Sequence, residues 1–162
     1  MAQKVFYSFH FVRDSHRVSQ VRNMGVVEGQ PLLSSNEWED VKEGGDSAIE
    51  DWIDEQMKGK KCAVVLIGSK TAGRHWVEHE IKRAWEADKG VLGVHIHGLK
   101  NLAGEQDTKG ANPFKGVSAG DESDLSTVVK TYDPPYTTST YVYDHIKDNL
   151  ADWIEKAIEA RA

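Results

Sequence analysis

The chain of 162 residues contains a single cysteine and four prolines, and it has no long apolar run. Its one thiol, Cys62, cannot form an internal disulfide, so a reducing, cytoplasmic setting is expected. No apolar segment approaches the roughly 20 residues that a membrane-spanning helix needs, and we expect no membrane association. The first residues do not combine a basic segment with a long apolar stretch, so no signal peptide is expected.

Positive charge is also in short supply. The chain has 20 Lys and Arg against 26 Asp and Glu, which gives a formal net charge of -6. Because nucleic-acid binding depends on clustered cations, no nucleic-acid partner is expected. The glycines form no GxGxxG or Walker-type phosphate loop, and no serine lies in a GxSxG elbow. These absences argue against a Rossmann dinucleotide loop, a P-loop NTPase and a serine hydrolase of the usual type.

Apolar runs alternate with amphipathic stretches along the chain. Residues 4–9, 62–67 and 91–96 are apolar throughout, as is typical of parallel strands buried on both faces. A weak edge strand is expected at 31–33 and a last strand at 125–132. The pattern predicts one α/β domain over residues 1–162, with a mostly parallel five-stranded sheet and helices on both faces.

Helices are expected between these strands. Asp14 or Ser15 can cap the first, which runs to about Met24. A second follows the capping-box spacing of residues 47–50, a third contains Glu80, and a last one spans 141–160. Residues 25–45 and 98–123 are polar or Gly-rich, so we expect mobile loops there. If these loops flank the active site and become ordered only when a partner binds, activity should be low in the resting protein.

Glu80 is an acid in an apolar setting. At about 100° per residue it falls inside the apolar arc of its own helix, one turn from Trp76 and Ala84. A carboxylate among indole and alkyl groups loses hydration, which makes it a candidate for chemistry. The alternative is a structural acid at the rim of the core that reaches water or pairs with Arg83.

Ligands of parallel sheets bind beyond the carboxyl ends of the strands, where the strand order reverses. We therefore expect a cleft at that edge, with Glu80 as its reactive group. Three successive strand–helix connections supply its other predicted substrate-binding residues: Ser8, Phe9, His10, Trp38, Ser69 and Trp76.

Three histidines offer a further combination. His95 and His97 are spaced i, i+2 on an expected strand, so both lie on one face, and His10 ends another strand. Together they could hold a metal. No acid close in sequence completes such a site, and core or rim histidines are the favoured interpretation. We predict no metal site and no prosthetic group.

Several segments resemble the TIR domain superfamily. Val5-Phe-Tyr-Ser-Phe9 and the run from Cys62 to Ser69 are similar to its first and third strands. Trp76-Val-Glu-His-Glu80 is similar to the W-x-x-x-E motif that carries the TIR glutamate. The chain most resembles bacterial TIR-like proteins of the ThsB type, from Thoeris antiphage defence. The likeness is strongest over residues 4–114 and returns near 142–155. Its further matches are residues 37–40, 112–114 and 142–144.

This resemblance implies a flavodoxin-like fold and an enzyme that takes NAD+ as substrate rather than as a bound cofactor. Glu80 would assist cleavage of the nicotinamide–ribose bond, followed by hydrolysis or by cyclisation of the ADP-ribose. The resemblance further implies self-association through TIR surfaces, and a separate downstream effector that responds to the nucleotide product.

Two other functions stay open on the sequence. One is a non-catalytic TIR-like module that signals by assembly, and the other is an enzyme related to nucleoside deoxyribosyltransferases, whose glutamate chemistry would look alike. The position of Glu80 separates the first alternative from an enzyme, because a salt-bridged glutamate would favour a structural role.

Overall fold

The fold is a parallel sheet between two layers of helices, seen in a computed structural model that describes residues 3–162. The first two residues of the predicted 1–162 domain lie outside the described part. In chain order the elements are β1 (Lys4–Ser8), α1 (Phe11–Asn23), β2 (Glu28–Gly29), α2 (Ser35–Glu43), α3 (Gly45–Met57), β3 (Cys62–Ile67), α4 (His75–Glu86), β4 (Gly90–His95), the 3-10 helix η1 (Leu125–Thr127), β5 (Thr131–Tyr132) and α5 (Ser139–Glu159).

The strand order is β2-β1-β3-β4-β5, and every neighbouring pair is parallel. The chain passes outward from β1 to β2 and then returns to place β3 on the other side of β1. The order therefore reverses between β1 and β3, which is the flavodoxin-like arrangement. The predicted five-stranded sheet with β1, β3 and β4 at its centre is confirmed.

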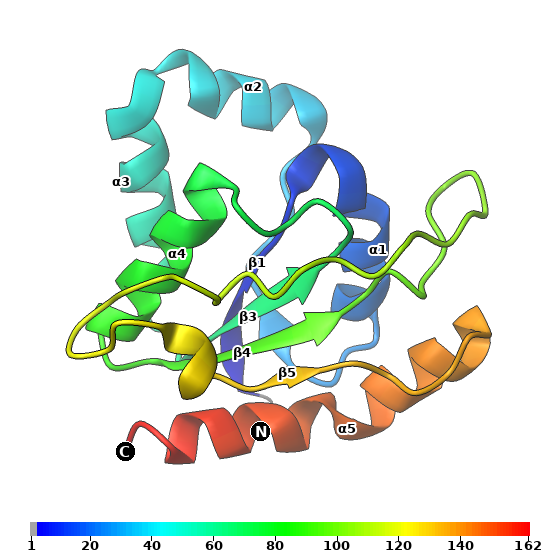
Figure 1. The fold of residues 1–162 in the computed structure, drawn as a ribbon. Coiled ribbons are helices and arrows are strands. Elements are labelled where there is room, and N and C mark those ends of the chain that lie inside the picture. The colour runs from blue at the N-terminus through cyan, green and yellow to red at the C-terminus, as the bar shows by residue number, and fades with distance from the viewer. Residues whose placement is uncertain (1–2) are drawn as a thin grey trace.

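The strands bury side chains on both faces. In β3, Cys62, Val64 and Leu66 face the core under α1 and α5. The alternate residues Ala63, Val65 and Ile67 face the core under α3 and α4. A strand covered on both sides needs apolar residues at every position, and this explains the continuous apolar runs in the sequence. Figure 1 shows α3 and α4 on one side of the sheet and α1 on the other.

Three expectations for the first half were wrong. Helix α1 begins at Phe11, because the His10 ring caps it by accepting a hydrogen bond from the Arg13 backbone. Residues 35–43 form helix α2 instead of a loop, and the capping box lies at Ser34 and Glu37. Helix α3 begins at Gly45 with no side-chain cap, so the capping spacing at 47–50 is not used.

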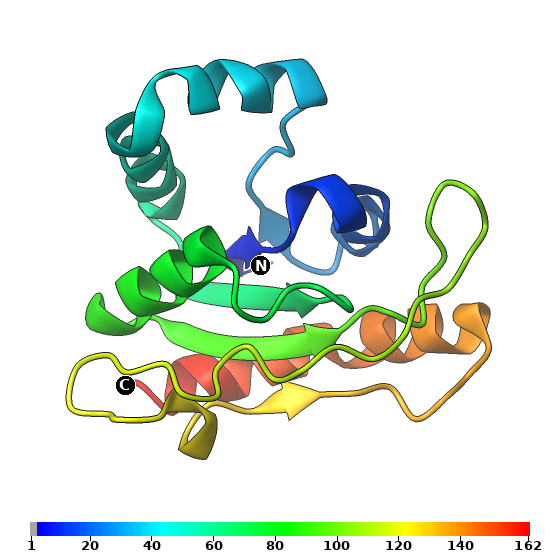
Figure 2. The ribbon, with the colours of Figure 1, turned by 45° about the horizontal axis from the view of Figure 1, so that its top comes forward.

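Helix α2 packs mainly against α3, and its residues from Asn36 to Glu43 are exposed or half-buried. In Figure 2, α2 lies away from the sheet. The acidic residues at 37–43 lie on this helix. Most of its polar surface faces water, which explains why its apolar periodicity is too weak to predict a helix from the sequence.

The sheet edge beside β1 is completed by a side chain. Strand β2 is only two residues long and lies before the apolar patch 31–33 that the sequence had suggested. The buried Gln30 amide then continues the ladder. It accepts from the Tyr7 backbone N–H at 2.8 Å and donates to the Tyr7 carbonyl at 2.9 Å. Backbone groups that lack a strand partner are satisfied in this way.

The segment 98–123 contains little regular structure and is anchored in the core at a few positions, while residues 100–112 are exposed or half-buried. Its apolar side chains Phe114, Val117 and Ala119 are buried in the core under α4, and Leu99 is buried on the other face. The expectation that this segment has little to pack was therefore wrong for residues 113–119 but holds for residues 100–112, and the mobility of the segment stays a prediction. The expected strand at 125–132 is mostly replaced by η1, with only β5 pairing to β4. No helix in the described range is long and apolar enough to cross a membrane.

Gly110 gives a direct test of how firmly this segment is held. A Cβ at Gly110 would overlap the carbonyl oxygen of Gly68 at the end of β3. Because this contact is between two backbones, Gly110→Ala must move one of them, and a loss of about 2 kcal/mol in the free energy of unfolding is expected. Urea denaturation measures it. The matched control is Ala111→Ser, which adds one atom at the exposed neighbouring position. Equal stability of the two variants would contradict close docking.

Candidate active site

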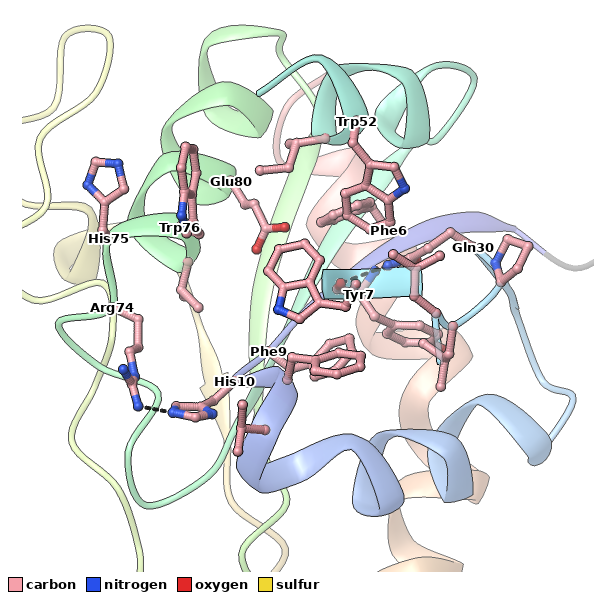
Figure 3. Close-up of a pocket in the computed structure, with 18 residues that line it drawn as sticks. Phe6, Tyr7, Phe9, His10, Gln30, Trp52, Arg74, His75, Trp76 and Glu80 are labelled. Carbon is pink, nitrogen blue, oxygen red and sulfur yellow. Dashed lines mark hydrogen bonds between the residues drawn. The ribbon is translucent and has the colours of Figure 1, made fainter. Parts of the chain in front are cut away.

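A cleft of about 280 Å³ opens where the strand order reverses (Figure 3). It lies between the end of β1, the start of α4 and the two helices α2 and α3. Most of its walls are aromatic or aliphatic. The lining residues are Phe6, Tyr7, Phe9, His10, Phe11, Val12, Gln30, Pro31, Leu32, Leu33, Trp38, Trp52, Ile53, Arg74, His75, Trp76, Val77 and Glu80.

Glu80 is the one carboxylate in this lining, and it is only 8% exposed. Ser8, at the end of β1, donates a hydrogen bond from its hydroxyl to Glu80 Oε1 at 2.6 Å. Within residues 3–162, the other carboxylate oxygen has no hydrogen-bond partner, and Figure 3 shows the carboxylate pointing into the cleft. Arg83 instead binds Asp54, with nitrogen–oxygen distances of 2.5 and 3.0 Å. The interpretation that Glu80 pairs with Arg83 is therefore wrong.

Burial raises the pKa of Glu80 to about 8, and the Ser8 hydrogen bond opposes this only in part. The physical cause is desolvation, because the charged form loses its water and gains no cation. At neutral pH the carboxyl group is thus mostly neutral when no cation lies beside it. A positive charge brought close by a ligand would favour the ionised form.

A chain of aromatic rings forms part of the cleft wall. Phe9 and Phe11 have centroids 6.3 Å apart, Phe11 and Trp38 are separated by 5.7 Å, and Trp38 and Trp52 by 6.0 Å. These rings join the end of β1 to α2 and α3. Trp38 is the part of α2 that reaches the cleft. A wall of this kind excludes water and strengthens electrostatic interactions inside.

His10 and Arg74 stand at the cleft mouth, at the starts of α1 and α4. The Nδ1 atom of His10 accepts from the Arg13 backbone at 3.2 Å, and its Nε2 atom contacts the Arg74 guanidinium. Burial and the charge of Arg74 both lower the pKa of His10, which keeps the ring neutral. Arg74 was missed in the sequence, although it lies only two residues before Trp76. Nothing local in the sequence shows that the segments carrying His10 and Arg74 meet.

Ser69 does not line the cleft, contrary to expectation. Its hydroxyl donates to Asp107 Oδ2 at 2.7 Å, and the same oxygen receives the Nε–H of Arg13 at 2.9 Å. Segment 98–123 covers the end of β3, so the Ser69 side chain turns toward that segment. The other predicted residues do meet: Phe9, His10, Trp38, Trp76 and Glu80 line the cleft, and Ser8 lies behind Glu80.

His95 and His97 lie apart from this cleft. Their ring centroids are 5.8 Å apart, and burial lowers the pKa of His95 to about 4. His10 lines the cleft mouth and not this pair's surroundings. No group of three or more His, Cys, Asp or Glu side chains in the described part of the chain is placed to hold a metal. His95 is buried and His97 is half-buried, which fits the interpretation as core or rim histidines.

Comparison with known proteins places the chain in a family. A sequence model for the TIR-like domain of Thoeris protein ThsB matches residues 6–101. The chain belongs to this family of ThsB TIR-like domains. All the residues that line the cleft fall inside the matched range. The resemblance inferred from Val5–Phe9, Cys62–Ser69 and the W-x-x-x-E motif is confirmed.

A curated relative comes from Bacillus cereus strain MSX-D12. It bears the provisional name cyclic ADP-D-ribose synthase ThsB1 and is 37% identical to this chain over 120 residues. The match covers 70% of this chain and 62% of the relative. The chain therefore matches less than two thirds of the length of that protein.

The raised pKa of Glu80 predicts how stability depends on pH. The unfolded chain loses this proton near pH 4.5, whereas the folded chain holds it until about pH 8. The stabilising effect of the neutral carboxyl is therefore complete below pH 4.5 and is lost as the pH rises through 8. Glu80→Gln has no carboxyl to ionise and so lacks this loss. Relative to the parent, its free energy of unfolding should therefore rise by at least about 2 kcal/mol between pH 5 and pH 9.

Chemical denaturation at both pH values measures this gain. The control is Glu86→Gln, which alters an exposed carboxylate on the same helix and should follow the parent. If Glu80→Gln and Glu86→Gln changed with pH in the same way, the carboxyl of Glu80 would not be desolvated.

Proposed function

We propose that this protein is an NAD+-processing enzyme that cleaves the bond between nicotinamide and ribose. The observation that supports it best is the Glu80 carboxyl, buried in a water-excluding cleft with no cation beside it and one oxygen free. Such a group has no evident structural role, because it costs stability at neutral pH and above. It suits a ligand that brings positive charge to the cleft.

In the proposed reaction the C1–N bond of the nicotinamide ribose breaks. The electron pair leaves with the ring, which departs as neutral nicotinamide. The ribose becomes an oxocarbenium-like cation, and the Glu80 carboxylate beside it stabilises the growing positive charge. Water then adds to C1 and loses a proton, which gives ADP-ribose. Alternatively, a nucleophile within the same ADP-ribose closes a ring and loses its proton.

The charge of the substrate explains how a mostly neutral carboxyl can act. The nicotinamide ring of NAD+ is cationic and would replace water in the cleft. A cation within a few ångströms lowers the pKa of a carboxyl group, so binding would ionise Glu80 where the charge is needed. Departure of the ring as a neutral molecule then leaves the ribose as the cation that Glu80 faces.

The aromatic walls favour a cyclic product. Water is the competing nucleophile at C1, and the rings around Trp38 and Trp52 limit its access. The relative from Bacillus cereus carries the name of a cyclic ADP-D-ribose synthase, which supports the same product class. We propose that the product acts as a signal in Thoeris antiphage defence and reaches a separate effector.

The alternative of a purely non-catalytic assembly module has less support. It predicts a Glu80 held in structural contacts, whereas Arg83 binds Asp54 and leaves Glu80 open to the cleft. Self-association remains compatible with the enzymatic proposal as a means of regulation.

Replacement of Glu80 tests the proposal. Glu80→Gln keeps the size of the side chain and removes its charge, so NAD+ turnover should fall at least about a hundredfold, as for loss of other preorganised electrostatic groups. Mass spectrometry of nicotinamide and ADP-ribose products at high protein concentration measures it. Glu86→Gln should keep the parent rate. Turnover of Glu80→Gln within a few-fold of the parent would remove Glu80 from the reaction.

The parent protein should also show a characteristic pH profile. Because the free enzyme must lose a proton from Glu80, kcat/KM should rise with pH and level off above an apparent pKa near 8. Initial rates at low NAD+ concentration between pH 6 and 9.5 measure this. A flat profile across that range would contradict the requirement for the ionised carboxylate.

Product partition depends on the dryness of the cleft. Trp38→Ala removes an indole from the wall and loosens the contact of α2 with Phe11 and Trp52. Water should then reach C1 more easily, so the ratio of linear to cyclic ADP-ribose should rise by a few-fold, at a rate that stays measurable. Chromatography of the products at equal nicotinamide release measures the ratio. An unchanged ratio would show that the wall does not control the nucleophile.

A further inference from the structure

Arg74 differs from the other arginines around it. It is exposed at the cleft mouth, and no carboxylate in the described range pairs with it. Arg13, Arg17 and Arg83 each bind an aspartate, namely Asp107, Asp14 and Asp54. An unpaired guanidinium beside an apolar cleft is thus available to an anion from outside the chain.

The partner that Arg74 does contact cannot satisfy it. A neutral imidazole has one nitrogen that accepts and one that donates. The Nδ1 atom of His10 accepts from the Arg13 backbone N–H, which favours the tautomer with its proton on Nε2, the atom that contacts the Arg74 guanidinium. Both groups are donors, and the charge of Arg74 disfavours a second proton on the ring. The pair presents several N–H groups and has no acceptor between them.

The position of this pair relative to Glu80 fits a single ligand. Arg74 is the residue just before α4, and its helix start has no side-chain cap. Glu80 lies six positions after Arg74, which at 1.5 Å per residue is about 9 Å between their backbone positions along the helix axis. Figure 3 shows Arg74 and His10 at one end of the cleft and Glu80 deeper inside. One sugar with a substituent at each end spans such a gap.

We propose that Arg74 and His10 form a phosphate subsite, which binds the 5′-phosphate of the ribose whose C1 atom lies beside Glu80. The inference rests on the proposed cleavage at C1 and adds the substrate class: nucleotides with a 5′-phosphate rather than nucleosides. A cleft of about 280 Å³ is at the small end for ligand sites. It would therefore hold the nicotinamide–ribose half of a dinucleotide, and the rest of the dinucleotide would extend out of the cleft from the phosphates.

A binding experiment tests the subsite without any turnover. Inorganic pyrophosphate is titrated into the protein by calorimetry at low salt. Arg74→Gln should weaken binding at least about tenfold, since a charge-assisted contact is lost. Arg74→Lys should restore part of it. Arg83→Gln removes the same charge from the same helix outside the cleft and should bind like the parent.

An activity experiment then compares NAD+, nicotinamide mononucleotide and nicotinamide riboside. Arg74→Gln should raise KM at least about tenfold for the two phosphorylated substrates while kcat changes little. Its kcat/KM for the riboside should equal that of the parent. A merely structural role for Arg74 would lower kcat/KM for all three substrates together.

The outcomes separate the two proposals. If pyrophosphate does not bind the parent, or binds Arg74→Gln equally well, the subsite is overturned. An equal loss of NAD+ and riboside cleavage in Arg74→Gln also overturns it. If the parent cleaves none of the substrates but binds pyrophosphate through Arg74, the subsite stands and the proposed reaction fails.

Discussion

One hydrogen bond between distant parts of the chain places the Glu80 carboxyl in the cleft. Ser8 ends the first strand and Glu80 lies in the second turn of α4, yet the hydroxyl and the carboxyl meet at 2.6 Å. This contact fixes where the carboxyl points. Because no cation accompanies it, desolvation dominates its ionisation, and the fold carries a group that is costly when charged. In the proposed reaction, a cationic ligand removes this cost because its charge stabilises the ionised carboxylate.

The surrounding elements serve to keep this carboxyl dry. The sheet places the ends of β1 and β3 side by side, and the reversal of strand order leaves room for a cleft beside them. Trp38 and Trp52 close one side, while Arg74 and His10 stand where the cleft opens to water. The site is therefore graded from an apolar interior to a cationic mouth, and a molecule with a cationic ring at one end and phosphates beyond it suits that gradient.

Local pattern was enough to predict the features that depend on neighbours in sequence. The apolar runs at 62–67 and 91–96 predict inner strands, and helical periodicity places Glu80 on a buried face beside Trp76. The strand order then brings Ser8, Phe9 and His10 to the same edge. These inferences succeed because a parallel strand that is buried on both faces has apolar residues at nearly every position, and this run is visible in the sequence.

The errors concern features that long-range contacts determine. Helix α2 exists because it packs on α3 and places Trp38 against Phe11, although its own periodicity is weak. Ser69 turns away from the cleft because Asp107, far along the chain, covers the end of β3. The meeting of Arg74 with His10 likewise joins two loops. A single sequence does not record which loops meet.

The ionisation of Glu80 is the most direct test of this account. Carbon-13 NMR can follow the Glu80 carboxyl through a pH titration, with the resonance assigned by its loss in Glu80→Gln. The account predicts a pKa near 8 in the free protein and a clearly lower value when a cationic nicotinamide ligand fills the cleft. A pKa close to 4.5 in the free protein, unchanged by the ligand, would contradict it.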